Sequence, residues 1–549
     1  MIERIPNYLG LDDAPLTYHG LARTALVILF AAGMVALVCT WARPYTTGIT
    51  ERVRWTGSTK GIAAAERLLC EYLTGHADDV GAWKLLVRLR TPNVFDPYLT
   101  GPGPRQLPVG MPSGNLNSEP LMDETAFLAF LEKSSVISPS ILKAWYRFNG
   151  DGLEAGLAAL GPLSDSARCT AAAEMYEQLG RLRKALEHYR QAAAFDPNDA
   201  NARNRTLRLL LNLDEVDEAT ALITDRTYRR AAEAHTLRDL YRQQHDFLRM
   251  LPHFIGAELA TMRWHMFVAS LVTGLTWFIF CLHMGYSWRW PRRDRLTAAA
   301  AVCLGYLSAI ICLFLVVVTD ELFQTDARSG IEFNLVYCIA GIGAREELTK
   351  LLFFVPLVPF LMRMENDLSI ITIASLTGLG FAVNENIKYY AASGGVDATG
   401  RFLTANFFHM VLTGYCGYYL VKAFQHGGEA WNTFTGQTLK MIVIHGLYDF
   451  MLIEPRMADY SILAMTVYIW LSQTYLRLIL ETSANFGWRP IPLTRLFVAA
   501  ISIVVGVTYI LIAGEFGMVA GFRLTVFSLL GVALISYMFF REFNEPVRR

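Results

Sequence analysis

Long apolar segments dominate the chain after residue 263. Crossing a bilayer as a helix takes about 20 predominantly apolar residues, and each segment approaches or exceeds that length. Together with an earlier apolar run at 24–42, they predict an all-α fold: a polytopic transmembrane helical bundle of about ten spans. The later segments lie near 264–284, 296–318, 333–362, 368–392, 401–424, 437–454, 461–480, 493–513 and 521–540.

The composition agrees with a protein embedded in lipid. Of 549 residues, 53% are hydrophobic and 18% are charged, whereas soluble chains carry about 25% charged residues. The 49 basic and 49 acidic residues cancel, which excludes a nucleic-acid binder held by a strong overall field. The bilayer itself is therefore the first expected partner.

The chain divides by hydropathy into five parts. Residues 1–23 form a polar, cytoplasmic lead, and 24–42 form a transmembrane anchor that we expect to be retained rather than cleaved as a signal peptide. Residues 43–263 contain no spanning run and predict an extramembrane α-helical domain. Residues 264–455 form the polytopic core, and 456–549 add further transmembrane helices and a short basic tail.

The extramembrane domain has a repeat-like pattern. Its clearest unit resembles a tetratricopeptide helix pair, in which small residues allow close helix packing, a glycine turns the chain and a proline ends the second helix. Weaker copies include Trp83 in one unit and Ala219 with Ile223 in another, and an unrelated helical bundle is the alternative. Gly101–Met122 is rich in Pro and Gly and predicts a linker. Either fold predicts a surface for a protein partner. The residues of the clearest unit are Ala173, Tyr176, Gly180, Ala185, Tyr189, Ala192 and Pro197.

Basic residues in the short loops predict the orientation. Loop 285–295 contains four arginines, so the positive-inside rule places it in the cytoplasm. Counting spans from there places loops 361–367, 425–436 and 481–492 in the cytoplasm as well. The same count places residues 43–263 outside it.

Four consecutive apolar segments contain ionisable residues. Each such residue costs about 2.5–3.5 kcal/mol at the centre of a membrane helix on insertion scales, so each needs a partner or a function. This pattern predicts one polar cluster inside the bundle. Its members are Glu346, Glu347 and Lys350 in the first segment, Glu385 with Asn386 in the second, His409 in the third, and His445 with Asp449 in the fourth.

Helical spacing sorts these residues into faces. Glu346 and Lys350 are four apart and can pair, while Glu347 is rotated by about 100° from Glu346. One carboxylate can therefore be paired while the other faces a cavity. His445 and Asp449 are also four apart, so Asp449 is expected to orient the imidazole.

Structural roles are the alternative for each position. Glu346 and Lys350 form a buried ion pair in that interpretation, and Glu385 accepts a hydrogen bond from Lys388 or Tyr389. His409 is then an interhelical hydrogen bonder. Asn386 is expected to join helices in either case.

The cluster has no serine or cysteine nucleophile, which indicates water activation. We expect Glu346 to act as general base, with Glu347 positioning water or substrate. His409 and His445 would stabilise the oxyanion and the leaving group, and Glu385 would complete the polar cavity. Lys350, Asn386 and Asp449 are the supporting residues.

A metal version would use much the same atoms. Zinc accepts carboxylate and imidazole ligands and acidifies bound water, and the candidate ligands are Glu346, Glu347, His409 and His445. No H-E-x-x-H motif is present, and Lys350 would repel a cation. Chemistry that requires no cofactor is therefore preferred, with zinc as the alternative.

The motifs together resemble the PrsW family of intramembrane proteases, relatives of the CAAX prenyl endopeptidases and Abi membrane proteins. The resemblance rests on E-E-x-x-K at 346–350, F-x-x-x-E-N at 381–386, His409 and H-G-x-Y-D-F at 445–450. It implies a bacterial cytoplasmic membrane protein that cleaves single-pass regulatory substrates such as anti-sigma factors. Lys350 and Glu385 depart from the CAAX pattern, which disfavours prenyl-protein processing.

Two other classes of function remain. A proton-coupled transporter or channel could use the same buried Glu and His residues as a relay, although the sequence lacks the internal symmetry common in transporters. An inactive protease-fold scaffold or sensor would use only the helical domain. In the protease interpretation that domain captures substrates or senses stress.

Overall fold

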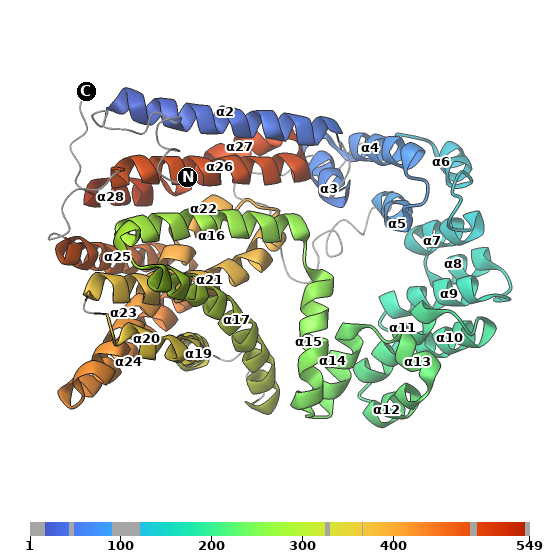
Figure 1. Cartoon of the computed structure of the whole chain (residues 1–549). Helices are drawn as coiled ribbons and strands as arrows, with labels where there is room; N and C mark the ends of the chain where they lie inside the picture. Colours follow the sequence, from blue (N-terminus) through green and yellow to red (C-terminus); the bar gives the residue numbers. More distant parts are fainter. Residues whose placement is uncertain are drawn as a thin grey trace. The chain divides into compact units, whose positions relative to one another are not determined.

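The computed structural model describes residues 17–42, 49–90, 121–323, 330–364, 366–483 and 491–543, and every element in these ranges is helical. Most of the lead at 1–23, most of the Gly101–Met122 linker and the basic tail at 544–549 lie outside them. The chain forms two compact units, described separately below (Figure 1). One contains the apolar helices and the other contains residues 42–261.

Six helices in the described ranges are long and apolar enough to cross a membrane. A bent pair, α27 (Met518–Gly531) and α28 (Ala533–Glu542), would make a seventh span, with a 52° angle between its halves. About ten spans were expected from the sequence. The six are α2 (Tyr18–Ala42), α16 (Trp264–Met284), α17 (Arg292–Phe323), α21 (Asp367–Ser393), α25 (Ser461–Ser483) and α26 (Leu493–Phe516).

The other three expected segments carry most of the polar cluster. Two of them form long helices, α23 (Ala405–His426) and α24 (Glu429–Ile453). The third, 333–362, is interrupted several times. It runs through α18 (Ile331–Val336), the π-helix η3 (Tyr337–Gly343), α19 (Ala344–Phe354), the 3₁₀ turn η4 (Val355–Leu357) and α20 (Val358–Leu361).

Two sequence features accompany these interruptions. Pro356 lies in η4, directly after α19 ends, and Pro359 lies at the start of α20. Because proline cannot donate the helical hydrogen bond, each of them interrupts the regular helix. The π-helix directly precedes the helix that carries Glu346 and Glu347, and π-turns often occur beside functional residues. Apolarity and length alone could not predict either break.

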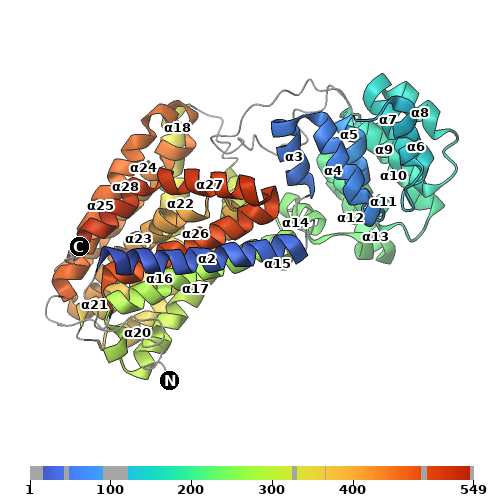
Figure 2. The same cartoon turned by 90° about the horizontal axis from the view of Figure 1, so that it is seen from above.

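Helix α21 lies at the centre of the apolar unit and is largely buried. It packs against α16, α17 and α23, and Figure 2 shows α24, α25 and α28 side by side at the edge of the same unit. Glycines make the central contacts possible. A Cβ atom at Gly378 would lie 2.1 Å from the carbonyl oxygen of His409, and one at Gly380 would lie 2.0 Å from that of Val302.

The second unit is a series of helix pairs that follow one another along the chain (Figure 1). In the clearest expected repeat, α9 (Ser166–Gln178) and α10 (Leu182–Phe195) are joined by a turn at Gly180, whose φ of 69° suits glycine. Ala173, Ala185 and Tyr189 are buried between them. The helices of this unit are α3 (Ile49–Lys60), α4 (Ile62–Gly75), α5 (Val80–Leu89), α6 (Glu124–Leu131), α7 (Pro139–Asp151), α8 (Leu153–Leu160), α9 (Ser166–Gln178), α10 (Leu182–Phe195), α11 (Ala200–Asn212), α12 (Val216–Thr224), α13 (Arg226–Ala231), α14 (Ala234–Gln243) and α15 (Phe247–Thr261).

Candidate active site

Four helices bring the predicted polar residues into one connected cluster. Helix α19 carries two carboxylates and a lysine, α21 carries a carboxylate and an amide, α23 carries one imidazole, and α24 carries an imidazole and a carboxylate. Hydrogen bonds and ion pairs connect all of them. The cluster consists of Glu346, Glu347, Lys350, Glu385, Asn386, His409, His445 and Asp449.

Lys350 lies in the middle of the cluster and is fully buried. Its Nζ is 2.8 Å from Glu347 Oε1, 3.2 Å from Glu346 Oε2 and 2.8 Å from His409 Nδ1. An ammonium group has three hydrogens to donate, so these acceptors satisfy it completely. The ring of Phe381 lies 4.0 Å from the same nitrogen, a favourable position for a cation.

The hydrogen-bond partners assign the tautomer of His409. Because the Lys350 ammonium can only donate, Nδ1 of His409 must accept. The proton of the neutral ring is therefore on Nε2, which donates to Glu385 Oε2 at 3.1 Å. Both nitrogens of His409 are thus engaged.

His445 is held differently from what its sequence spacing suggests. Its Nδ1 donates to Glu347 Oε1 at 2.9 Å, so a carboxylate from another helix is its closest partner. Asp449, the expected orienting residue, has its Oδ2 3.4 Å from Nε2, and Glu346 Oε2 is 3.7 Å from the same nitrogen. The i,i+4 spacing brings Asp449 alongside the ring, but α19 supplies the shorter contact.

The two adjacent glutamates have different environments. Glu347 is completely buried, and its Oε2 has no hydrogen-bond partner among the described residues. The Glu346 side chain is 15% exposed and lines a cavity. Only Glu346 of this pair can meet a molecule that enters the cavity.

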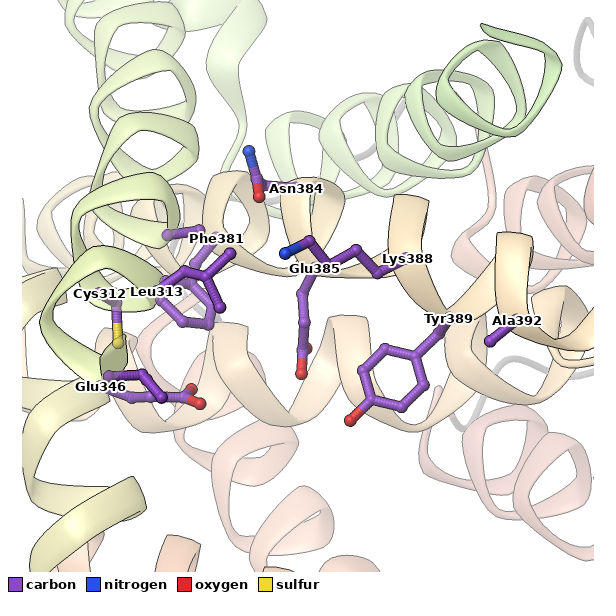
Figure 3. Close-up of a pocket in the computed structure, with 11 residues that line it drawn as sticks. Cys312, Leu313, Glu346, Phe381, Asn384, Glu385, Lys388, Tyr389 and Ala392 are labelled. Carbon is purple, nitrogen blue, oxygen red and sulfur yellow. The ribbon is translucent and has the colours of Figure 1, made fainter. Parts of the chain in front are cut away.

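The cavity has a volume of about 370 Å³ and lies between α17, α19 and α21. Figure 3 shows the Glu346 and Glu385 side chains entering this space, with Cys312 and Leu313 of α17 near Glu346. Apolar residues of α17 form one wall, and the polar residues come from α19 and α21. The full lining is Ala309, Cys312, Leu313, Val316, Glu346, Phe381, Asn384, Glu385, Lys388, Tyr389 and Ala392.

One member of the site was missed in the sequence. Arg401, on the short helix α22 (Ala398–Leu403), donates from Nη2 to Glu385 Oε2 at 2.7 Å and from Nε to Asn386 Oδ1 at 2.6 Å. Glu385 was expected to use Lys388 or Tyr389 if its role was structural, and the structure gives it Arg401 and His409. Arg401 begins the apolar segment 401–424, so the test for ionisable residues that found Lys350 could also have found it.

Asn386 connects α21 and α23, as its sequence context suggested. Its Nδ2 donates to Asn406 Oδ1 at 2.5 Å, and its Oδ1 accepts from Arg401. Both asparagines are fully buried. This amide pair fixes the approach of the two helices beside Glu385 and His409.

Three side chains of the two kinds that zinc accepts, carboxylate and imidazole, occur together in the cluster. One oxygen of Glu346 and one nitrogen each of His409 and His445 lie within 4.8 Å of one another, and one carboxylate with two imidazoles is a known zinc set. However, the Lys350 ammonium occupies Glu346 Oε2 and His409 Nδ1, and Glu385 occupies His409 Nε2. A metal ion could therefore take His409 as a ligand only if one of these contacts broke.

Residues 294–472 match the family described as PrsW family intramembrane metalloprotease. The match covers about a third of the chain and includes every residue of the cluster. It supports an intramembrane peptidase, and with the apolar helices it supports an integral membrane protein. Neither the comparison with curated proteins nor the comparison with solved structures found a match.

Proposed function

We propose that the protein is an intramembrane endopeptidase that hydrolyses peptide bonds with water activated by Glu346, without a metal ion. The proposal rests on one observation: two adjacent glutamates have different surroundings. Glu347 is buried against Lys350 and His445, whereas Glu346 faces the cavity. The buried ammonium of Lys350 thus holds the Glu346 carboxylate in place, while that carboxylate remains accessible to water in the cavity.

In the proposed reaction, Glu346 is the general base. It accepts a proton from a water molecule in the cavity while the water oxygen bonds to the carbonyl carbon of the substrate. The same proton then passes to the amine nitrogen as the C–N bond breaks. Nε2 of His445, at 3.7 Å from Glu346 Oε2, is placed to accept the second hydrogen of that water and orient it.

His409 supplies the donor for the oxyanion in this mechanism. Its Nε2–H points to Glu385, a cavity residue, and turns to the developing negative charge when a substrate is bound. Hydrogen bonds aimed at such a charge are among the largest contributions to catalysis. Glu347 and Lys350 hold the base and both imidazoles in place.

The substrate we propose is a membrane-anchored regulatory protein, of the anti-sigma-factor kind, with a single apolar span. The apolar wall formed by α17 supports this choice, because a lipid-embedded segment could lie against it beside Glu346. We further propose that the helical domain at 43–263 lies outside the cytoplasm of a bacterial cell and binds or senses a protein partner.

Proteolysis in liposomes tests the proposal. The purified protein would be assayed against a panel of single-pass substrates, with Glu346→Gln as the test variant and Glu429→Gln, an exposed glutamate on α24, as the matched control. Cleavage by wild type and Glu429→Gln but not by Glu346→Gln is expected. Full activity in Glu346→Gln would contradict the proposal. A wild type that moves protons across the liposome membrane and cleaves nothing would favour a transporter.

A further inference from the structure

Arg401 donates hydrogen bonds to two neighbouring residues of α21. Its guanidinium donates to Glu385 at 2.7 Å and to Asn386 at 2.6 Å, and it lies 3.6 Å from the centre of the Tyr389 ring. The side chain is 16% exposed. This three-point attachment fixes the guanidinium closely for a residue on a six-residue helix.

The contact with Glu385 reaches His409 through a single oxygen atom. Glu385 Oε2 accepts from Arg401 Nη2 and from His409 Nε2. The Glu385 side chain is 26% exposed and enters the cavity, so without Arg401 its carboxylate can rotate toward water. The Nε2–H of His409 would then lose its fixed acceptor.

We propose that Arg401 is a positioning residue for the reaction: by holding the Glu385 carboxylate, which lines the cavity, it fixes the orientation of His409 through its Nε2–H. This inference rests on the proposed function and deepens it. A planar guanidinium suits the role because its fixed fork can bind two acceptors simultaneously, whereas an ammonium is a point charge. Arg401→Lys should therefore keep a kcat between that of Arg401→Ala and that of the wild type.

Kinetics in liposomes provide the first test. Small misplacements of catalytic groups lower rates by as much as about 100-fold, and we expect Arg401→Ala to lower kcat by about 10- to 100-fold with little change in KM, and Arg401→Lys by less. Arg477→Ala is the matched control, because Arg477 also pairs with a glutamate in the apolar unit, at 3.8 Å from Glu542 Oε2. It should leave kcat unchanged.

A double-mutant cycle separates positioning from general stabilisation. If Arg401 acts through Glu385, then adding Arg401→Ala to Glu385→Ala should change kcat by no more than roughly two-fold, since residues that act through one contact are not additive. If the loss of kcat in the double variant equals the product of the losses in the two single variants, the two residues act independently and the inference is overturned.

A spectroscopic signature tests the same point without a substrate. In ¹⁵N-histidine-labelled protein, assigned with His409→Gln, the Nε2–H proton of His409 should exchange slowly with water in the wild type and in Arg477→Ala. It should exchange rapidly in Arg401→Ala. Equal exchange in Arg401→Ala and wild type would overturn the inference even if no substrate is cleaved. Failure of the proposed function would appear separately, as unchanged cleavage by Glu346→Gln.

Discussion

Nζ of Lys350 lies 2.8 Å from Nδ1 of His409, inside a cluster that also contains four carboxylates from three helices. The ammonium thereby takes the place that a metal ion would need on this imidazole. It also forms ion pairs with two adjacent glutamates, Glu346 and Glu347. The contact explains how so many ionisable groups can share the interior of a membrane bundle.

Removing this cation should destabilise the fold. Lys350→Met leaves Glu347 charged and fully buried, and breaking a buried pair in this way typically costs about 3–5 kcal/mol. We expect a loss of that size in the free energy of unfolding, measured by denaturant titration in detergent micelles. The double variant Lys350→Met with Glu347→Gln should recover part of the loss, and a double variant less stable than the single one would contradict the account.

The contacts of His445 predict unequal effects for two carboxylates. Glu347 makes the 2.9 Å hydrogen bond to its Nδ1, whereas Asp449 lies 3.4 Å from Nε2. Glu347→Gln should therefore lower kcat/KM by about 10- to 100-fold, the usual effect of losing an orienting partner, and Asp449→Asn by less. Steady-state cleavage rates measure the difference. A larger loss in Asp449→Asn would show that Asp449 orients the ring.

Close packing of α21 and α23 should be sensitive to one methyl group. A Cβ at Gly378 meets the His409 carbonyl oxygen at 2.1 Å, so Gly378→Ala must push the two helices apart. Overpacking of this kind costs about 1–3 kcal/mol, and we expect cleavage to fall as His409 moves. Gly400→Ala is the control, because a Cβ there has no neighbour within 4 Å. Equal thermal stability of both variants would argue against this packing.

The predicted orientation of the helical domain can be checked in intact cells. Leu248 is 89% exposed on α15, so Leu248→Cys should react with a membrane-impermeant maleimide added outside the cells. The unsubstituted protein gives the background from native cysteines. Labelling only after the cells are opened would place the domain in the cytoplasm.

Sequence reasoning identified most of the cluster because membrane burial makes every ionisable residue conspicuous. Spacing within one helix placed Glu346 and Glu347 on different faces, as the cavity requires. Spacing within one helix could not predict contacts between helices. The hydrogen bonds between Glu347 and His445 and between Arg401 and Glu385 depend on how the helices are placed in three dimensions. The π-helix before Ala344 likewise has no signature in hydropathy.

Metal dependence distinguishes water activated by Glu346 alone from water activated by a bound zinc ion. Wild-type protein would be purified, treated with a strong zinc chelator, analysed for bound metal by mass spectrometry and then assayed for cleavage in liposomes. If Glu346 alone activates the water, a preparation with far less than one metal ion per chain should cleave at the untreated rate, and Glu346→Gln should not cleave. Loss of cleavage with the chelator and its return on adding zinc would contradict a water molecule activated by Glu346 alone.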